Sequence, residues 1–164
     1  MTTLHEEVCA ALRDAEFRPS KRLGQNFLVH NNVIASILRL LDLVPEDEVV
    51  EIGPGLGFLT RRLVEGARTV WAVEVDPVLV DKLKTSPIGA HPALQLIHHD
   101  ILKIPLADFL PAYKVKLVGN LPYSISSPVL FRLLDWRERF SSAFSALSRK
   151  APARALKPPR PRDA

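Results

Sequence analysis

The stretch Val49-Val50-Glu51-Ile52-Gly53-Pro54-Gly55-Leu56-Gly57 determines how the rest of this 164-residue chain can be placed. Its opening apolar residues predict a short buried strand, and the three alternate glycines then let the backbone turn sharply and approach a ligand closely. A helix is predicted from about Phe58 to Glu65, so the amide donors at its N-terminus face whatever lies over the strand end. This pattern is typical of a nucleotide-type pocket, although a glycine-rich turn alone also fits a purely structural bend.

The next acidic residues help to identify the ligand class. The dinucleotide fingerprint requires a further Gly or Ala three positions after its second glycine, where this chain has Phe58, so a nicotinamide or flavin cofactor is disfavoured. The apolar run 69–73 ends in Glu74, about twenty residues beyond the first glycine, where a carboxylate can accept both hydroxyls of a ribose. Glu74 and Asp76 could instead cap the helix that starts near Pro77, and we assign that second role to Asp76.

Two more strands are predicted downstream, over 94–97 and 114–119, each followed by polar residues. In an open α/β sheet, the loops at the carboxyl ends of the strands converge on one crevice. Four residues at successive strand ends are therefore expected to share it: Gly53, Glu74, Asp100 and Asn120.

The segment Asn120-Leu121-Pro122-Tyr123 has the groups needed to hold an adenine amine. That amine is a poor nucleophile because its lone pair is delocalised into the ring, so a catalyst must orient it and accept its hydrogen bonds. The Asn120 side-chain oxygen and a main-chain carbonyl at Leu121 or Pro122 can accept them, and the Tyr123 ring offers a stacking contact worth roughly 1–3 kcal/mol. Alone, the segment also fits ordinary loop punctuation, but its combination with the glycine turn and Glu74 favours a site.

Together, the glycine turn, Glu74, Asp100 and the 120–123 segment resemble S-adenosylmethionine-dependent methyltransferases of the amino-adenine type. The upstream segment Lys21-Arg22-Leu23-Gly24-Gln25-Asn26-Phe27-Leu28 narrows the resemblance to the small-subunit ribosomal RNA adenine-N6,N6-dimethyltransferases, over about residues 19–140. The resemblance implies a Rossmann-like class I methyltransferase α/β sheet, S-adenosyl-L-methionine as cofactor, and ribosomal RNA of the small ribosomal subunit as partner.

The same resemblance implies roles for individual residues. The catalytic residues would be Asn120, Leu121, Pro122 and Tyr123. The cofactor would contact Asn26, Leu28, Gly53, Gly55, Glu74, Asp100 and Asn120. Lys21 and Arg22 would lie near RNA phosphates, whereas by chemistry alone the 20–28 loop could equally be a solvated linker.

Composition sets outer limits on the chain. It is 47% hydrophobic and 24% charged, as expected for one soluble globular domain. It has no apolar run of the roughly 18 residues that cross a membrane and no signal-peptide pattern, and its start is acidic, so a cytoplasmic location is expected. The single Cys9 and the histidines 91, 98 and 99 lack partners at metal-ligand spacing, so no metal site is expected.

Charge is distributed unevenly along the chain. Residues 141–164 hold six of the 22 Lys and Arg and one of the 18 Asp and Glu, which leaves 16 basic and 17 acidic groups in residues 1–140. The overall basicity therefore gives no argument for RNA binding by the folded part. Residues 141–164 also contain four of the 14 prolines, and a disordered basic tail is expected there.

Residues 1–140 are thus predicted to form a partial methyltransferase domain with about four parallel strands and flanking helices, truncated relative to the family. Its fourth strand would be an unpaired edge, and a monomer is expected unless something covers that edge.

Helices are also predicted outside the motifs. Residues 4–17 fit a short amphipathic helix, and Asn31 or Asn32 should cap a second helix. Its expected core stripe is Val33, Ile34, Ile37, Leu38 and Leu41. Ser126 or Ser127 should cap a third helix that begins at Pro128 and buries Val129, Leu130, Leu133 and Leu134.

Three functions fit the sequence. The first is N6,N6-dimethylation of ribosomal RNA adenosines, and the second is methylation of DNA bases or protein glutamine on the same cofactor fold. The third is a non-catalytic fragment that binds cofactor or RNA without turnover.

Overall fold

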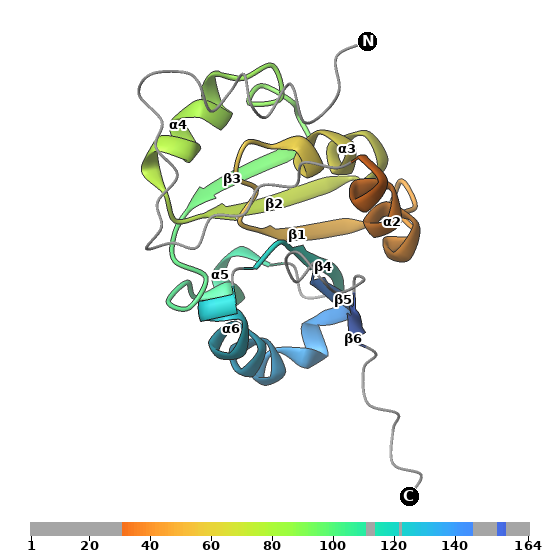
Figure 1. Cartoon of the computed structure of the whole chain (residues 1–164), viewed down its shortest axis with the longest axis vertical. Coiled ribbons are helices and arrows are strands. Elements are labelled where there is room, and N and C mark those ends of the chain that lie inside the picture. The colour runs from red at the N-terminus through yellow and green to blue at the C-terminus, as the bar shows by residue number, and fades with distance from the viewer. Residues whose placement is uncertain (1–30, 111–113, 122, 146–153, 157–164) are drawn as a thin grey trace, which may run out of the picture.

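The computed structural model describes residues 31–110, 114–121, 123–145 and 154–156. They build a six-stranded sheet in the order β3-β2-β1-β4-β5-β6 (Figure 1). The strands are β1 (Glu48–Ile52), β2 (Thr69–Glu74), β3 (Leu94–His98), β4 (Val115–Gly119), β5 (Phe140–Ser145) and β6 (Arg154–Leu156). The first five are parallel, and β6 runs antiparallel to β5. The predicted Rossmann-like α/β sheet is confirmed, but the predicted number of about four parallel strands was too low.

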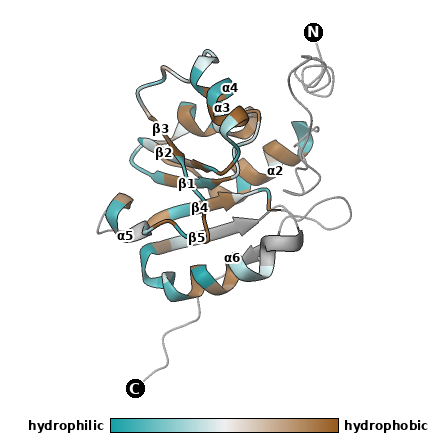
Figure 2. Ribbon diagram, turned by 90° about the vertical axis from the view of Figure 1, so that its left-hand side faces the viewer, coloured by the Kyte–Doolittle hydropathy of each residue, from teal (hydrophilic) through white to brown (hydrophobic). Residues whose placement is uncertain are grey.

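Helices cover both faces of the sheet (Figure 2). One face carries α2 (Asn31–Leu41), α3 (Phe58–Gly66) and α4 (Pro77–Thr85). The other carries α5 (Leu106–Phe109), α6 (Tyr123–Asp135) and the 3₁₀ turn η2 (Arg137–Arg139). Each layer has its own apolar core, as expected for a parallel sheet buried on both sides.

Polar contacts tie together the amino ends of the central strands. Lys116 Nζ at the start of β4 lies 2.7 Å from Asp47 Oδ2, and the exposed fractions of the two side chains are only 16% and 20%. Glu48 at the start of β1 is buried and accepts hydrogen bonds from Arg68 and from the Trp71 indole. The glycine turn and the polar residues that follow each strand lie at the opposite, carboxyl ends of the strands.

The expectation that β4 would be an unpaired edge was wrong. β4 pairs in parallel with β5, with Val115 opposite Phe140 and Gly119 opposite Ser145. Phe140 is buried in the same core as α6. Part of the segment expected to be a disordered tail therefore belongs to the sheet, whereas residues 146–153 and 157–164 lie outside the described residues.

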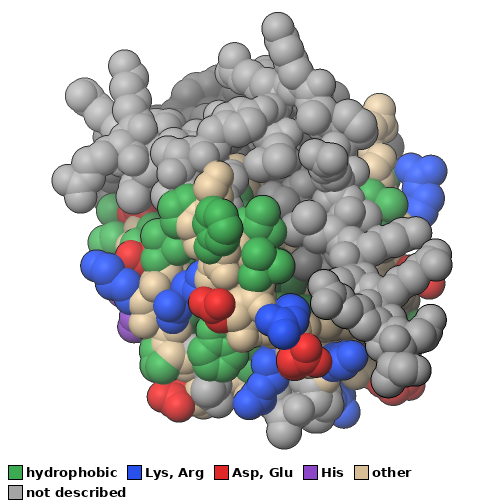
Figure 3. All heavy atoms as spheres, turned by 90° about the horizontal axis from the view of Figure 1, so that it is seen from below, with side chains coloured by type: hydrophobic (Ala, Val, Ile, Leu, Met, Phe, Trp, Pro, Cys, Tyr) green, Lys and Arg blue, Asp and Glu red, His purple; other side chains and the backbone are tan. Residues whose placement is uncertain are grey.

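The helix expected from Pro128 begins five residues earlier, at Tyr123, and Pro128 lies inside it. A proline fixes φ near the helical value and removes a single hydrogen-bond donor, so a helix can pass through it when packing supports the neighbouring turns. Val129 and Leu133 are buried as predicted, but Leu130 and Leu134 are exposed. Figure 3 views this side of the molecule and shows hydrophobic side chains among basic and acidic ones.

The helix predicted near Asn31 is present as α2. Ile34, Ile37 and Leu41 are buried and Leu38 packs against their core, but Val33 is exposed, so the predicted stripe was too wide by one residue. The helix predicted at 4–17 lies outside the described residues.

Candidate functional site

Four strand ends meet at one edge of the sheet, which we call the carboxyl edge. Ile52, the last residue of β1, is paired with Val73 of β2 and with Gly119, the last residue of β4. Glu74 at the end of β2 pairs with His98 at the end of β3. The structure therefore brings together the four positions expected to share a crevice: Gly53, Glu74, Asp100 and Asn120.

The three glycines of the turn after β1 have positive φ angles, in the left-handed region. Gly53 has φ of +68° and its amide donates to the Val73 carbonyl, so the turn starts from the sheet itself. A Cβ added at Gly53 would have no atom within 4 Å, which leaves open space at the strand end. A Cβ at Gly57 would instead lie 2.6 Å from Leu83 Cδ2, so this glycine lets α3 pack against α4. Gly53 thus lies at the exposed side of the turn, and Gly57 at its packed side.

Glu74 is held by three backbone amides. Its Oε1 accepts from Val75 and Asp76, and its Oε2 accepts from Gly55 at 3.1 Å. Burial raises the pKa of this carboxyl in spite of those three donors. Because an ionised carboxylate accepts about four hydrogen bonds, one position remains for a ligand hydroxyl. A second ribose hydroxyl would have to share or replace the Gly55 amide.

Glu51 is a candidate site residue that the sequence reasoning did not single out. It lies in β1 two residues before Gly53 and is only 2% exposed. Its Oε2 has no hydrogen-bond partner among the described residues, and neither has the hydroxyl of Thr60 in α3. Burial raises the pKa of Glu51 to about 8, and the Glu74 charge acts in the same direction. The available signal was a carboxylate inside an apolar strand.

Val75 is a second residue that was missed. It follows Glu74 at the end of β2 and is 43% exposed, although it is apolar. An exposed valine between Glu74 and the helix cap Asp76 offers a flat apolar contact at the carboxyl edge. Its signal in the sequence was the alternation of acidic and apolar residues directly after a buried strand.

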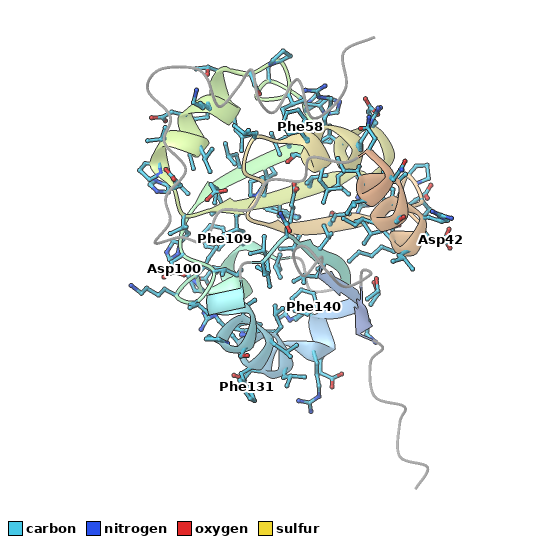
Figure 4. The ribbon with its side chains drawn as sticks, in the orientation of Figure 1. Asp42, Phe58, Asp100, Phe109, Phe131 and Phe140 are labelled. Atoms are coloured by element: carbon cyan, nitrogen blue, oxygen red, sulfur yellow. The ribbon has the colours of Figure 1, made fainter. Side chains whose placement is uncertain are left out.

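Asp100 organises the loop that follows β3. Its Oδ1 accepts from the Leu102 amide at 2.9 Å, and its carbonyl accepts from the amides of Lys103 and Ile104. The loop begins with His99, whose amide donates to the Glu74 carbonyl. The second carboxylate oxygen of Asp100, Oδ2, lies 3.9 Å from Nζ of the exposed Lys103, and such an exposed ion pair is weak enough for a ligand to compete with it (Figure 4).

The segment 120–123 joins β4 to α6. Asn120 follows β4 directly and is half-buried. The Leu121 side chain is buried in the apolar core between the sheet and α6. Tyr123 is the first residue of α6. Pro122 lies outside the described residues.

Four other predicted site residues also lie outside the described residues: Lys21, Arg22, Asn26 and Leu28. Within the described ranges, no group of three or more His, Cys, Asp and Glu side chains could hold a metal ion. No helix in those ranges is long and apolar enough to cross a membrane.

Comparison with known proteins assigns this arrangement to a family. The family model described as ribosomal RNA adenine dimethylase matches residues 16–156. The chain belongs to the ribosomal RNA adenine dimethylase family. The match runs past residue 140, where the sequence analysis ended the resemblance, and includes β5 and β6.

Curated members of the ribosomal RNA adenine dimethylase family resemble the chain over about half of their own length. Ribosomal RNA small subunit methyltransferase A of Chlorobium limicola is 42% identical over 131 residues, which are 80% of this chain and 48% of that protein. The protein of the same name from Geobacter metallireducens is 40% identical over 156 residues, 93% of this chain and 56% of that one.

A solved structure supports the same fold. The crystal structure of the 23S rRNA methyltransferase ErmE matches with a TM-score of 0.65 and 32% identity, over 73% of this chain and 47% of that one. The sheet is therefore that of a class I methyltransferase, as predicted. Family membership implies a methyl donor of the S-adenosylmethionine type, and the residues present fit one. Gly53 leaves space, Glu74 keeps an acceptor position, and the buried Glu51 oxygen lacks a donor among the described residues.

Proposed function

We propose that this chain carries the donor-binding and adenine-holding part of an enzyme that methylates the N6 amine of adenosines in small-subunit ribosomal RNA, twice, with S-adenosyl-L-methionine. The observation that carries the proposal is the carboxyl edge, where the glycine turn, Glu74, Asp100 and Asn120 follow the ends of four adjacent strands. Parallel α/β sheets bind ligands at this edge, where the strand order reverses between β1 and β4.

On this proposal, the donor lies across the ends of β1, β2 and β3. Gly53 and Gly55 have no side chains, so the donor can approach the backbone of the glycine turn. Glu74 accepts a hydrogen bond from a ribose hydroxyl of the donor, and Asp100 contacts its adenine ring. Val75 provides an apolar surface for that ring, since it is exposed beside Glu74. Asn26 and the Leu28 main chain would complete the methionine end. The buried Glu51 carboxyl, whose Oε2 has no partner among the described residues, would hydrogen-bond a polar group of the ligand.

The target adenine would be held by the 120–123 segment. When bound, S-adenosylmethionine supplies an electrophilic methyl group on a sulfonium. The Asn120 side-chain oxygen and a main-chain carbonyl at Leu121 or Pro122 accept hydrogen bonds from the two N–H groups of the amine and so orient its lone pair. Tyr123 stacks on the extruded base. Rate acceleration then comes from positioning and charge placement rather than from a strong base.

The substrate RNA is proposed from the relatives. The curated relatives are named for the small ribosomal subunit, whereas ErmE is named for 23S RNA, so a large-subunit adenosine is the second candidate. Lys21 and Arg22 would contact the RNA phosphates in either case. Because the chain spans about half the length of those relatives, a fragment that binds the donor without turnover is the third candidate.

A transfer assay separates these candidates. The chain is incubated with methyl-labelled S-adenosylmethionine and unmethylated small or large ribosomal subunits. The proposal expects label in N6-methylated adenosine of the small subunit only, and at least about a hundredfold loss in Asn120→Ala.

Donor binding is measured beside transfer. Asn120→Ala should still bind S-adenosylhomocysteine, since most of the donor contacts come from β1, β2 and β3. Binding without transfer in the unchanged chain would select the donor-binding fragment. Label in the large subunit would select the second candidate, and no binding would contradict all three.

A further inference from the structure

The loop after β3 contacts helix α6 through apolar packing and through a part-buried hydrogen bond. Arg132, in α6, donates from Nη2 to the carbonyl of Ile104, the last residue of the turn that Asp100 organises. Ile104 has no exposed surface, so water does not compete for this hydrogen bond. Figure 4 shows Asp100 on the α6 side of the molecule, with Phe131 on the outer side of that helix.

Both main-chain polar groups of Ile104 form hydrogen bonds. Its amide donates to the Asp100 carbonyl at 2.9 Å, and its carbonyl accepts from Arg132. A short chain of hydrogen bonds therefore runs from Asp100 through Ile104 to α6, the helix that begins at Tyr123. It connects the strand end proposed for the donor with the element proposed for the target base.

The other hydrogen bonds of the loop after β3 do not connect it to α6. The Leu102 and Lys103 amides bond within the turn and shape it without fixing its place. His99 ties the start of the loop to β2 through the Glu74 carbonyl. Ile104 packs in the same apolar core as Val129 and Leu133 of α6, and the directional contact between the end of this turn and the helix is the hydrogen bond from Arg132.

The guanidinium is committed to this position. Its Nε is buried and has no hydrogen-bond partner among the described residues. An unpaired buried N–H costs free energy, so Arg132 keeps this rotamer because its other contacts, among them the hydrogen bond to Ile104, outweigh that cost. The hydrogen bond to Ile104 thus differs from that of the exposed Arg137 in η2, whose acceptor is the Leu134 carbonyl.

We propose that Arg132 is a positioning residue for donor binding, because it fixes the Asp100 loop against α6. This inference rests on the proposed function, since Asp100 is the residue through which Arg132 would act. The residue contributes no contact of its own to the donor. Its effect on binding should therefore depend on whether the Asp100 carboxylate is present.

A double-mutant cycle tests this dependence. The affinity for S-adenosylhomocysteine is measured by calorimetry on the full chain, on Arg132→Met, on Asp100→Ala and on the double variant. We expect Arg132→Met to weaken binding about fivefold when Asp100 is present and less than about twofold when it is absent. Equal losses in both backgrounds, or no loss in either, would overturn the proposal.

A matched control separates positioning from a general loss of charge. Arg137→Met removes an exposed arginine that also donates to a main-chain carbonyl, that of Leu134, but outside the Asp100 loop. Its affinity should equal that of the unchanged chain. Arg132→Lys keeps the charge and one donor and should fall between the two. Arg132→Lys takes the place of Arg132→Met in the double-mutant cycle if Arg132→Met does not fold.

Hydrogen exchange tests the contact without any ligand. Arg132→Met should speed amide exchange in residues 100–105 and leave β1 unchanged, and Arg137→Met should alter neither. Unchanged exchange in 100–105 would overturn the tether even if donor binding fails. If exchange behaves as expected but the unchanged chain does not bind S-adenosylhomocysteine, the proposed function fails while the contact stands.

Discussion

Among the residues that the structure describes, Glu51 is a carboxyl whose pKa lies far from its ordinary value. Its carboxyl is buried in β1, and burial raises its pKa from 4.5 to about 8. Between these two pKa values the native state keeps the Glu51 proton and the unfolded state has lost it. The free energy of unfolding therefore decreases as the pH rises through this range. The stability of the chain should therefore fall as pH rises from about 4.5 to about 8 and level off above that value.

Glu51→Gln tests this at the residue scale. Glutamine has nearly the same shape and does not titrate, so the variant should lose the pH dependence that Glu51 causes. The free energy of unfolding in urea should be similar for the two proteins near about pH 5, and the variant should be more stable by more than about 1 kcal/mol near about pH 8.5. A difference that does not change with pH would show that Glu51 is ionised in the native state.

At the scale of elements, α4 has the best-defined start. Asp76 caps it by accepting from the Val78 amide at 2.9 Å, and Pro77 occupies the first position of the helix. Asp76→Ala should lower the free energy of unfolding by about 1 kcal/mol, since that amide then loses its partner. Asp81→Ala, at an exposed position in the same helix, is the control and should change stability by less than about 0.5 kcal/mol. Equal effects would contradict the cap.

The elements that the sequence predicted well are those with two independent signals. β1 and β2 are apolar runs that end in residues with special backbone or charge requirements, and α4 has both a cap and a proline. β5 has neither signal, because Phe140-Ser-Ser-Ala-Phe-Ser145 lacks β-branched residues and alternates poorly. It forms because β4 offers a full set of backbone partners, which is tertiary information.

The same contrast applies within the site. Glycines, Glu74 and Asp100 could be assigned because they follow strands at regular intervals. Arg132 could not, because its contact with Ile104 joins residues 28 positions apart and depends on where α6 crosses the loop. The start of α6 was misplaced because two serines before a proline mimic a helix cap, whereas the backbone is already helical at Tyr123.

At the scale of the whole molecule, β5 lies between β4 and the edge strand β6 and extends the sheet beyond β4. It pairs with β4 along the strand and contributes Phe140 to the core below the sheet. A chain that ends at residue 139 should therefore unfold at a temperature lower by at least about 5 °C and form aggregates through the exposed β4. A chain that ends at residue 156 keeps both strands and should behave as the full chain does in calorimetry and gel filtration. Equal melting of all three would show that β5 adds nothing to stability.

The central claim is that the carboxyl ends of β1 to β4 form the donor site. The most direct test is a titration of the ¹⁵N-labelled chain with S-adenosylhomocysteine, followed through backbone amide chemical shifts. The account predicts saturable shifts at Gly53, Gly55, Val75 and Asp100 and unchanged amides at the amino ends of the same strands, such as Glu48 and Lys116. Shifts confined to the amino ends, or none at saturating ligand, would contradict it.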